Sequence, residues 1–266
     1  MRPLGIGSIA LVVVTLVGVG LGVLRAAPQQ PPPDFRTLLE EGRTASRGPG
    51  ELSEFYFTRG VYTAGWRWGS WRIDFPKADR QFMAAVNSLI DINAAEHENP
   101  VSLDDPKLRR YPFLYVLEVG DMALSASEAR GLREYLLAGG FLVIDDFWGS
   151  WEWGNFERQI RHVLPEHPIV EIPLDHPIFN AVYRIDEIVQ VPAVGNHWRG
   201  RTWEQDGYTA HARGIFDENG RLMVIINWNT DLGDAWEWFE RPEYPLEFSS
   251  FAVQMGVNFI VYAMSH

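Results

Sequence analysis

Cysteine is absent from the 266-residue chain. Its absence excludes disulfide bonds, thiol nucleophiles, cysteine-ligated metals, iron–sulfur clusters and a lipidated N-terminal cysteine. Basic residues are also scarce: 23 Lys and Arg face 35 Asp and Glu, and the formal net charge of −12 argues against nucleic acid as the main partner. Because 46% of the residues are hydrophobic and 22% are charged, the composition is that of a globular protein.

The common enzyme signatures are missing as well. The chain has no G-x-S-x-G nucleophile elbow, no H-E-x-x-H zinc helix, no Walker loop and no EF-hand loop. Its seven histidines are scattered without the spacing of metal ligands. We therefore expect no cofactor and name no metal ligands from the sequence.

One long uncharged run lies at the N-terminus. It extends over 21 residues, from Leu4 to Leu24, between Arg2 and Arg25. At about 1.5 Å per residue, a helix of that length spans the roughly 30 Å hydrocarbon core of a bilayer. We predict that residues 1–25 are a single membrane anchor, with the rest of the chain extracytoplasmic (periplasmic). The alternative is a cleaved signal segment, which would give a secreted protein.

A Pro-rich linker follows the predicted anchor. Residues 26–50 begin with AAPQQPPP, and we predict a folded domain over residues 51–266. Because residues 34–266 carry 21 basic and 35 acidic side chains, this part has a net charge of −14 and is not attracted to anionic lipid. We therefore expect contact with the membrane through residues 4–24.

Apolar runs alternate with helical patterns along the predicted domain, an order typical of α/β folds with a mainly parallel sheet. The runs FLYVLEV and FLVIDD are nearly continuous, as expected for strands covered on both faces. Predicted strands cover residues 54–58, 113–119, 141–146, 188–191, 210–216 and 221–227, the last two joined by a D-E-N-G turn. Predicted helices begin at Pro76 and at Ser125, where Glu128 has capping-box spacing, and cover residues 153–164 and 251–264. The last is too short to span a bilayer, and we expect it to be buried.

Eleven tryptophans fall in four short segments, each after a predicted strand. If the strands are parallel, these segments meet at the edge formed by the carboxyl ends, where α/β sheets bind ligands. Aromatic rings beside carboxylates and amides suit a glycan, although Trp is also favoured at protein–protein contacts and in the small cores of long loops. The predicted ligand-binding residues of this tryptophan rim are Arg59, Tyr62, Trp66, Trp71, Asp74, Trp148, Trp151, Asn227 and Trp228, with Asp231 nearby. For Arg59, a structural ion pair is the alternative to clamping an anion.

Asp145 and Asp146 end the predicted strand FLVIDD. A carboxylate pair at a strand end can bind a hard cation or act in acid–base chemistry, and Asp175 could orient His176 for such chemistry. We therefore take Asp145, Asp146 and His176 as candidate catalytic residues. The structural alternatives are that one aspartate caps the following loop and that Asp175-His176-Pro177 is a turn.

Five segments carry a resemblance to a known family. They are EFYFTRGVY, WRIDFPKADRQF, the run from YPFLYVLEVG to GGFLVIDDFWG, LPEHPIVEIPLDHPIF and MGVNFIVYAM, in this order over residues 53–264. The chain resembles the bacterial family called domain of unknown function 4159. This resemblance implies a flavodoxin-like three-layer sandwich, similar to class I glutamine amidotransferase-like domains, and a link to the membrane.

The resemblance also places Asp145-Asp146 where amidotransferases carry their nucleophilic cysteine. Because the chain has no cysteine, glutaminase activity is excluded. Two functions are left open. The first is a membrane-anchored, extracytoplasmic module that is not catalytic and binds a glycan or an envelope protein through the tryptophan rim. The second is a hydrolase that acts on a carbohydrate or envelope polymer, with Asp145 or Asp146 as acid or base.

Overall fold

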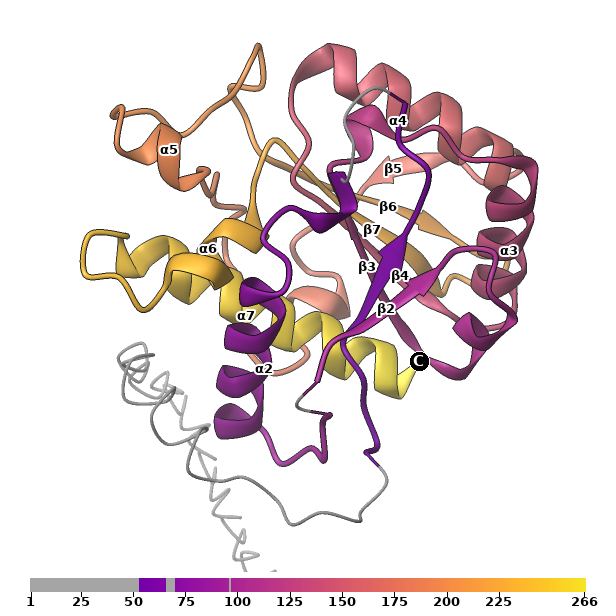
Figure 1. Cartoon of the computed structure of the whole chain (residues 1–266), viewed down its shortest axis with the longest axis horizontal. Coiled ribbons are helices and arrows are strands. Elements are labelled where there is room, and N and C mark those ends of the chain that lie inside the picture. Colours follow the sequence, from indigo (N-terminus) through magenta and orange to yellow (C-terminus); the bar gives the residue numbers. More distant parts are fainter. Residues whose placement is uncertain (1–52, 66–69, 96) are drawn as a thin grey trace, which may run out of the picture. The chain divides into compact units, whose positions relative to one another are not determined.

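A seven-stranded sheet organises the domain (Figure 1). The computed structural model describes residues 53–65, 70–95 and 97–266, so the predicted anchor and linker (1–50) and Trp66 lie outside the described residues. The strand order is β2-β1-β3-β4-β7-β6-β5. The strands are β1 (Thr58–Val61), β2 (Asn99–Ser102), β3 (Phe113–Leu117), β4 (Phe141–Asp145), β5 (Ile169–Glu171), β6 (His211–Phe216) and β7 (Leu222–Trp228).

Most of the sheet is parallel. The neighbours from β2 to β7 run in one direction, whereas β6 runs antiparallel to both β7 and β5. The predicted α/β class with a mainly parallel sheet is therefore confirmed, as is the hairpin that joins β6 to β7. Because β1, β3, β4 and β7 are parallel, their carboxyl ends meet at one edge of the sheet.

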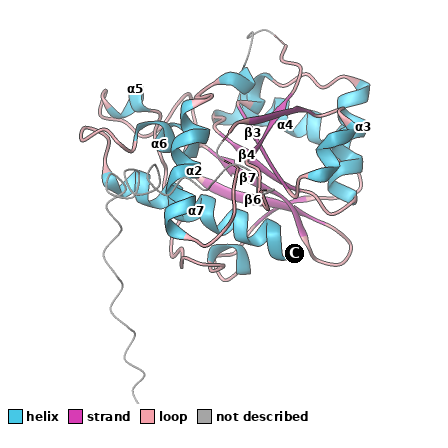
Figure 2. Ribbon diagram, turned by 60° about the horizontal axis from the view of Figure 1, so that its bottom comes forward, coloured by secondary structure: helices cyan, strands magenta, loops and turns pink. Residues whose placement is uncertain are grey.

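Helices cover both faces of the sheet (Figure 2). The helices α2, α6 and α7 pack on one face around the first hydrophobic core, and α3 and α4 pack on the other face around the second. Their bounds, with that of the short helix α5, are α2 (Lys77–Leu89), α3 (Ala126–Leu137), α4 (Gly149–Val163), α5 (Val194–His197), α6 (Leu232–Trp238) and α7 (Leu246–Ser265). Along β3, Phe113, Tyr115 and Leu117 belong to the first core, and Leu114 and Val116 to the second. Burial on both faces explains the unbroken apolar run.

Local sequence signals set several helix ends. Ser125 Oγ accepts a hydrogen bond from Glu128 N at 3.2 Å, and the Glu128 carboxylate accepts one from Ser125 N at 2.7 Å. This is the predicted capping box, and α3 begins directly after it. Gly139 follows the end of α3 with φ 108°, a conformation that favours glycine. Pro76 immediately precedes α2, also as predicted.

Two strand predictions are wrong. The predicted strand 54–58 lies before β1, which begins at Thr58 and buries the polar side chains of Thr58 and Arg59. The predicted strand 188–191 does not form, because Val191 pairs with the loop after β7. The Val191 N–H donates to Thr230 Oγ1 at 3.0 Å, and the Val191 carbonyl accepts from Asp231 N at 3.0 Å. The edge strands β2 and β5 have no counterpart among the predictions.

The C-terminal helix α7 is the one helix of the described residues that is long and apolar enough to cross a membrane, with a mean hydropathy of 1.2. Two-thirds of that stretch is buried inside the domain. Asn258 lies within α7, where its Oδ1 accepts hydrogen bonds from Val182 N (2.9 Å) and Tyr183 N (2.8 Å). These contacts tie the helix to the domain and confirm the predicted buried helix.

Candidate functional site: an aspartate cluster at the carboxyl edge of the sheet

Acidic side chains gather where the parallel strands end. Asp145 is the last residue of β4 and Asp146 follows it, Asp231 lies in the loop after β7, and Asp74 lies between β1 and α2. We call these four residues the aspartate cluster. Ligand sites of α/β proteins occur at this edge, because the loops that follow neighbouring strands converge there.

Three members of the cluster are close enough to share one ion. Carboxylate oxygens of Asp74, Asp146 and Asp231 all lie within 4.8 Å of one another. Asp74 also forms a second group of this kind with Asp234 and Glu237 of α6. Hard divalent cations bind oxygen ligands at about 2.0–2.6 Å, so oxygens with this spacing can surround a single ion.

Neutral donors hold the carboxylates in place. Trp148 Nε1 donates to Asp146 Oδ1 at 3.0 Å, and Asp231 Oδ1 caps α6 by accepting from Asp234 N at 2.7 Å. The side chain of Asp145 is fully buried, and its Oδ2 accepts from the Tyr115 hydroxyl at 2.6 Å. Backbone N–H groups at the start of α6 donate to the same oxygen. These donors fix the geometry without neutralising any charge.

Three buried polar atoms of this region have no hydrogen-bond partner: Asp145 Oδ1, Asp74 Oδ2 and Asn227 Nδ2. Asn227 directly follows Ile226, which pairs with Ile144 of β4. By strand alternation, its side chain faces the first core beside that of Asp145. Buried polar groups are nearly always hydrogen-bonded, so these three atoms call for a partner such as water, a cation or another ligand.

The cluster is electrostatically unbalanced. Burial raises the pKa of Asp145 to about 7. Burial also raises the pKa of Asp146 and of Asp231 well above the ordinary value, and neighbouring carboxylates raise both further. The pKa of Asp74 is well above its ordinary value because of burial and of Asp234, although Arg59 opposes this shift. Around neutral pH, the cluster therefore favours either bound protons or a bound cation.

The backbone is constrained at the same place. Asp74 (φ 61°), Glu118 (φ 54°) and Asp146 (φ 45°) all adopt the left-handed conformation. Aspartate tolerates this region better than most residues, but the conformation is still costly and is common at functional sites. Gly233 permits close approach at the start of α6, because a Cβ atom there would lie 2.5 Å from Asp74 Oδ2.

Arg59 and Tyr62 have structural roles at this edge. Arg59 is fully buried and binds the Asp79 carboxylate through Nε, at 3.1 Å to each oxygen, and through Nη2. Its Nη1 donates to the Trp71 carbonyl at 3.2 Å. The Tyr62 hydroxyl donates to the Leu117 carbonyl at 2.9 Å. The structure thus favours the structural ion pair for Arg59 over the anion clamp.

The tryptophans of the predicted rim have different environments. Trp148 is buried and binds Asp146, as described above. Trp71 is half-buried against the second core, and Trp228 stacks on His211 with ring centroids 5.1 Å apart. Trp151 remains 68% exposed at the start of α4. Among the described tryptophans of the rim, Trp148 is therefore the one with a hydrogen bond to the cluster.

His176 lies away from the aspartate cluster. It precedes a short 3₁₀ helix (Pro177–Phe179), and its Nδ1 accepts from Ile178 N at 3.2 Å. Its ring packs on Phe216, the last residue of the antiparallel strand β6. The end of β6 lies beside the start of β7, at the opposite edge of the sheet. The structure does not bring His176 together with Asp145 and Asp146, and its hydrogen bond fits the predicted turn.

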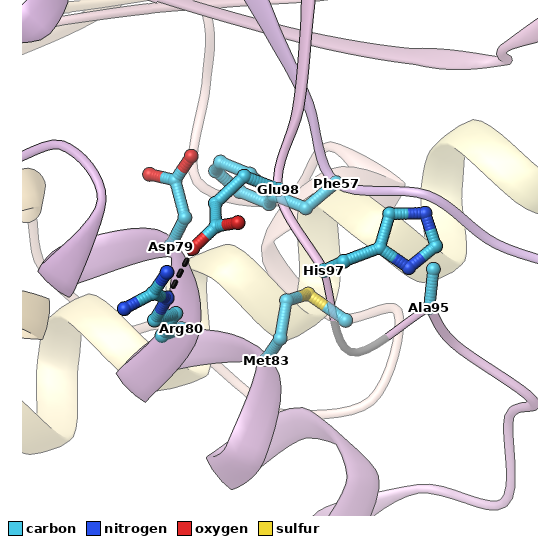
Figure 3. A pocket seen from close by; sticks show the side chains of 7 residues that line it. All are labelled: Phe57, Asp79, Arg80, Met83, Ala95, His97 and Glu98. Carbon is cyan, nitrogen blue, oxygen red and sulfur yellow. Dashed lines mark hydrogen bonds and ion pairs between the residues drawn. The ribbon is translucent and has the colours of Figure 1, made fainter.

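A small cavity lies next to the Arg59–Asp79 pair (Figure 3). This cavity of about 10 Å³ has room for roughly one water molecule. Two of its lining residues, Arg80 and Glu98, form an ion pair. It is lined by Phe57, Asp79, Arg80, Met83, Ala95, His97 and Glu98. A space of this size is too small for a substrate.

Some acidic residues beside the cluster have only weak sequence signals. Asp234 and Glu237 lie on α6, three and six residues after Asp231, a spacing that any amphipathic helix shows. Glu118 follows β3, and its charge raises the pKa of Asp146. The signal that could have found Glu118 is its place directly after a buried strand, the same signal that identifies Asp146.

Comparison of the chain with curated proteins found no match. The family model described as Domain of unknown function (DUF4159) matches residues 61–264. The matched segment contains all four members of the aspartate cluster and every described strand from β2 to β7. The chain therefore belongs to the family with the domain of unknown function DUF4159.

Proposed function

We propose that this protein binds a hard divalent cation at the aspartate cluster and through it holds a polar ligand of the cell envelope. The observation that carries the proposal is the convergence of Asp74, Asp146 and Asp231 oxygens within 4.8 Å. Two unpartnered buried atoms support it. Asp145 Oδ1 is an acceptor within the cluster that a cation can use. Asn227 Nδ2 is a donor, which cannot ligate a cation but can bind an acceptor group of the polar ligand.

A cation would resolve the electrostatic problem of the cluster. Arg59, the basic group that lowers the pKa of Asp74, makes its hydrogen bonds to Asp79 and to backbone carbonyls. It therefore does not neutralise the cluster by direct contact. Carboxylate oxygens are the ligands that Mg²⁺ and Ca²⁺ prefer, and the single positive end of α6 next to Asp145 cannot balance four aspartates.

Thermal unfolding of the full chain tests the proposal. We expect Mg²⁺, Ca²⁺ or Mn²⁺, added to about 10 mM, to raise the Tm by several degrees, since ligands that bind the native state stabilise it. Asp146→Asn keeps the hydrogen bond from Trp148 but should abolish the shift. Asp186→Asn is the matched control, because Asp186 is exposed and pairs with Arg184 at the surface. An absent shift, or an equal shift in Asp146→Asn, would refute the proposal.

A hydrolase is the second candidate, and the position of Asp146 favours it. Asp146 connects β4 to the loop before α4 with φ 45°, a strained strand–turn–helix connection that presents catalytic side chains in many α/β enzymes. The same connection supports a flavodoxin-like, amidotransferase-like interpretation of the fold. Asp145, with its pKa raised to about 7, would be suited to general acid–base catalysis.

Release of reducing ends from envelope polysaccharide distinguishes this candidate. A hydrolase predicts turnover that is lost in both Asp145→Asn and Asp146→Asn and is unchanged in Asp186→Asn. Cation binding without any turnover over a broad panel of polysaccharides would leave the binding function and reject the hydrolase.

We further propose that residues 4–24 anchor the domain to the membrane, with the domain on the extracytoplasmic side. The support is the length of the uncharged run, which is sufficient for one span. The acidic domain offers no attraction of its own to anionic lipid. A topology reporter fused after His266 tests this placement: activity of a cytoplasmic-type reporter would overturn it, and release of the protein into the medium would favour the cleaved signal.

A further inference from the structure

An aromatic pocket adjoins the aspartate cluster on the side of α6. The helix α5 and the C-terminal end of α6 lie side by side (Figures 1 and 2). Between them and the loop before α7 is a cavity of about 300 Å³, at the lower end of the range of small-molecule sites. We call it the aromatic pocket, and it is lined by Val194, Trp198, Trp238, Arg241, Glu243 and Tyr244.

Asp234 connects this pocket to the acidic site. Its Oδ1 accepts from Trp238 Nε1 at 3.2 Å, and its Oδ2 accepts from Val194 N at 2.5 Å. The same carboxylate is grouped with Asp74 and Glu237. Because Asp74 belongs to both carboxylate groups, Asp234 and Asp74 together connect the aromatic pocket to the proposed cation site.

The pocket offers an open aromatic face. Trp198 is 64% exposed, and its ring meets Trp238 edge-on, with centroids 6.1 Å apart and an interplanar angle of 72°. Trp238 is less available, because the Lys77 ammonium lies 4.2 Å and the Arg241 guanidinium 5.8 Å from its centroid. Trp198 is thus the free platform of the pocket.

The charges around the pocket select among ligands with a flat face. Lys77 and Arg241 already lie near the ring of Trp238 and would repel a cationic ligand. Glu243 in the pocket lining and Glu237 beside Trp238, together with the net charge of −12, disfavour an anionic ligand such as a nucleotide. The Arg241 guanidinium and the Glu243 carboxylate, which both line the pocket, can bind hydroxyl groups as donor and acceptor. A neutral pyranose ring, with one apolar C–H face and a rim of hydroxyls, matches these features.

We infer that the aromatic pocket is a saccharide subsite, in which a neutral sugar ring stacks on Trp198 and hydrogen-bonds to Arg241 and Glu243. This inference deepens the proposed function, since it names the ligand class that the cation would help to hold. It places the ligand at Trp198 and Trp238, which lie in the tryptophan segments but outside the predicted rim residues.

Saturation-transfer NMR on the full chain tests the inference, with a neutral N-acetylglucosamine trimer and a glucose trimer as probes and with choline and a nucleoside monophosphate as comparisons. We expect at least one trimer to bind and the two charged compounds not to bind. Trp198→Ala should weaken binding about tenfold, as for an aromatic anchor, and Glu243→Gln should weaken it less. Tyr208→Ala is the matched control, because Tyr208 is 66% exposed, close to the 64% of Trp198, and does not line the pocket.

The possible results of this experiment distinguish the saccharide subsite from the cation site. Failure of both trimers to bind, preferential binding of choline or the nucleotide, or a loss in Tyr208→Ala instead of Trp198→Ala would overturn the inference. Asp146→Asn distinguishes the subsite from the cation site: saccharide binding that persists in this variant, together with loss of its cation-dependent Tm shift, would establish the pocket as a site in its own right. Weaker saccharide binding in Asp146→Asn would support the cation's part in holding the sugar.

Discussion

Asp79 and Asp145 are both buried carboxylates, yet their surroundings differ. Asp79 is bound by the Arg59 guanidinium, a charged and multidentate partner. Within the described residues, every hydrogen bond to Asp145 comes from a neutral donor, and its Oδ1 has no partner. Tyr115 separates the two regions, since its ring centroid lies 5.2 Å from the Arg59 guanidinium carbon and its hydroxyl binds Asp145.

The difference shows that a buried carboxylate is compensated by a partner of opposite charge. Burial raises the pKa of Asp79, but Arg59 opposes this shift. In the aspartate cluster, the neighbours are other carboxylates, and they raise the pKa of Asp146 further. A buried charge without a partner is costly. The Arg59–Asp79 pair therefore needs no further partner, whereas the aspartate cluster needs a proton or a ligand.

The largest effect on stability is expected from removing the positive charge of the Arg59–Asp79 pair. Arg59→Met leaves Asp79 buried without its partner and should lower the free energy of unfolding by about 3–5 kcal/mol. Denaturant unfolding of the full chain measures this loss. The double variant Arg59→Met/Asp79→Leu removes both charges and should recover most of the stability. A double variant as unstable as Arg59→Met would contradict the ion-pair explanation.

The aspartate cluster should make the protein less stable as the pH rises. The pKa of Asp145 is about 7 in the folded domain and near its ordinary value of 3.8 in the unfolded chain. Its stabilising contribution is therefore full below about pH 4 and is lost as the pH rises through about 7. With a chelator present, we expect the Tm to fall by roughly 5–10 °C between about pH 5 and pH 8.

Two controls make the pH prediction specific. Asp145→Asn should reduce the pH dependence, because it removes one of the titrating groups of the cluster. A divalent cation should restore much of the lost Tm near pH 8, where Asp145 has lost its proton, and little near pH 5. A Tm that rises over this interval in the chelated protein would show that the cluster is not an uncompensated group of acids.

A smaller effect is expected from filling the gap at Gly233. The added methyl group of Gly233→Ala would lie 2.5 Å from Asp74 Oδ2 and should cost about 1–3 kcal/mol through overpacking. By displacing Asp74, it should also reduce the cation-dependent Tm shift. Gly154→Ala is the matched control in a helix, since its nearest neighbour is an Arg158 nitrogen at 3.8 Å. Equal behaviour of the two variants would argue against a role for the close approach.

The smallest effect is expected at an exposed pair. Arg133 lowers the pKa of Glu166 to about 2, but both side chains are partly open to solvent, where screening weakens their attraction. Glu166→Gln should leave the Tm at neutral pH within experimental error. A clear loss would mean that the contrast between buried and exposed pairs is weaker than the structure indicates.

The central strands and their ends are predictable from the sequence. The run FLVIDD reveals both β4 and the position of Asp145 and Asp146, because apolar continuity and a terminal acidic pair are local signals. The capping box at Ser125 is local in the same sense. For this reason, the α/β class and the carboxyl-edge location of the candidate site follow from the sequence.

Tertiary pairing explains what the sequence conceals. β1 contains the buried Arg59, and a charged residue argues against a core strand in the sequence. Its burial is explained by the pair with Asp79 on α2, which the sequence does not indicate. The apolar run at 188–191 is bound by Thr230 and Asp231 instead of a strand. Asp234 enters the site through the start of α6, and no short-range pattern distinguishes it from an ordinary surface residue of a helix.

The helix α6 has a thermodynamic consequence for the two proposed sites. Asp231 caps its beginning and Trp238 ends it, so seven residues connect a proposed cation ligand to the wall of the aromatic pocket. Linkage requires that any factor by which the cation strengthens saccharide binding is returned by the saccharide to the cation. The affinity for an envelope glycan would then rise with the concentration of free divalent cation, and the affinity for the cation would rise with that of the glycan.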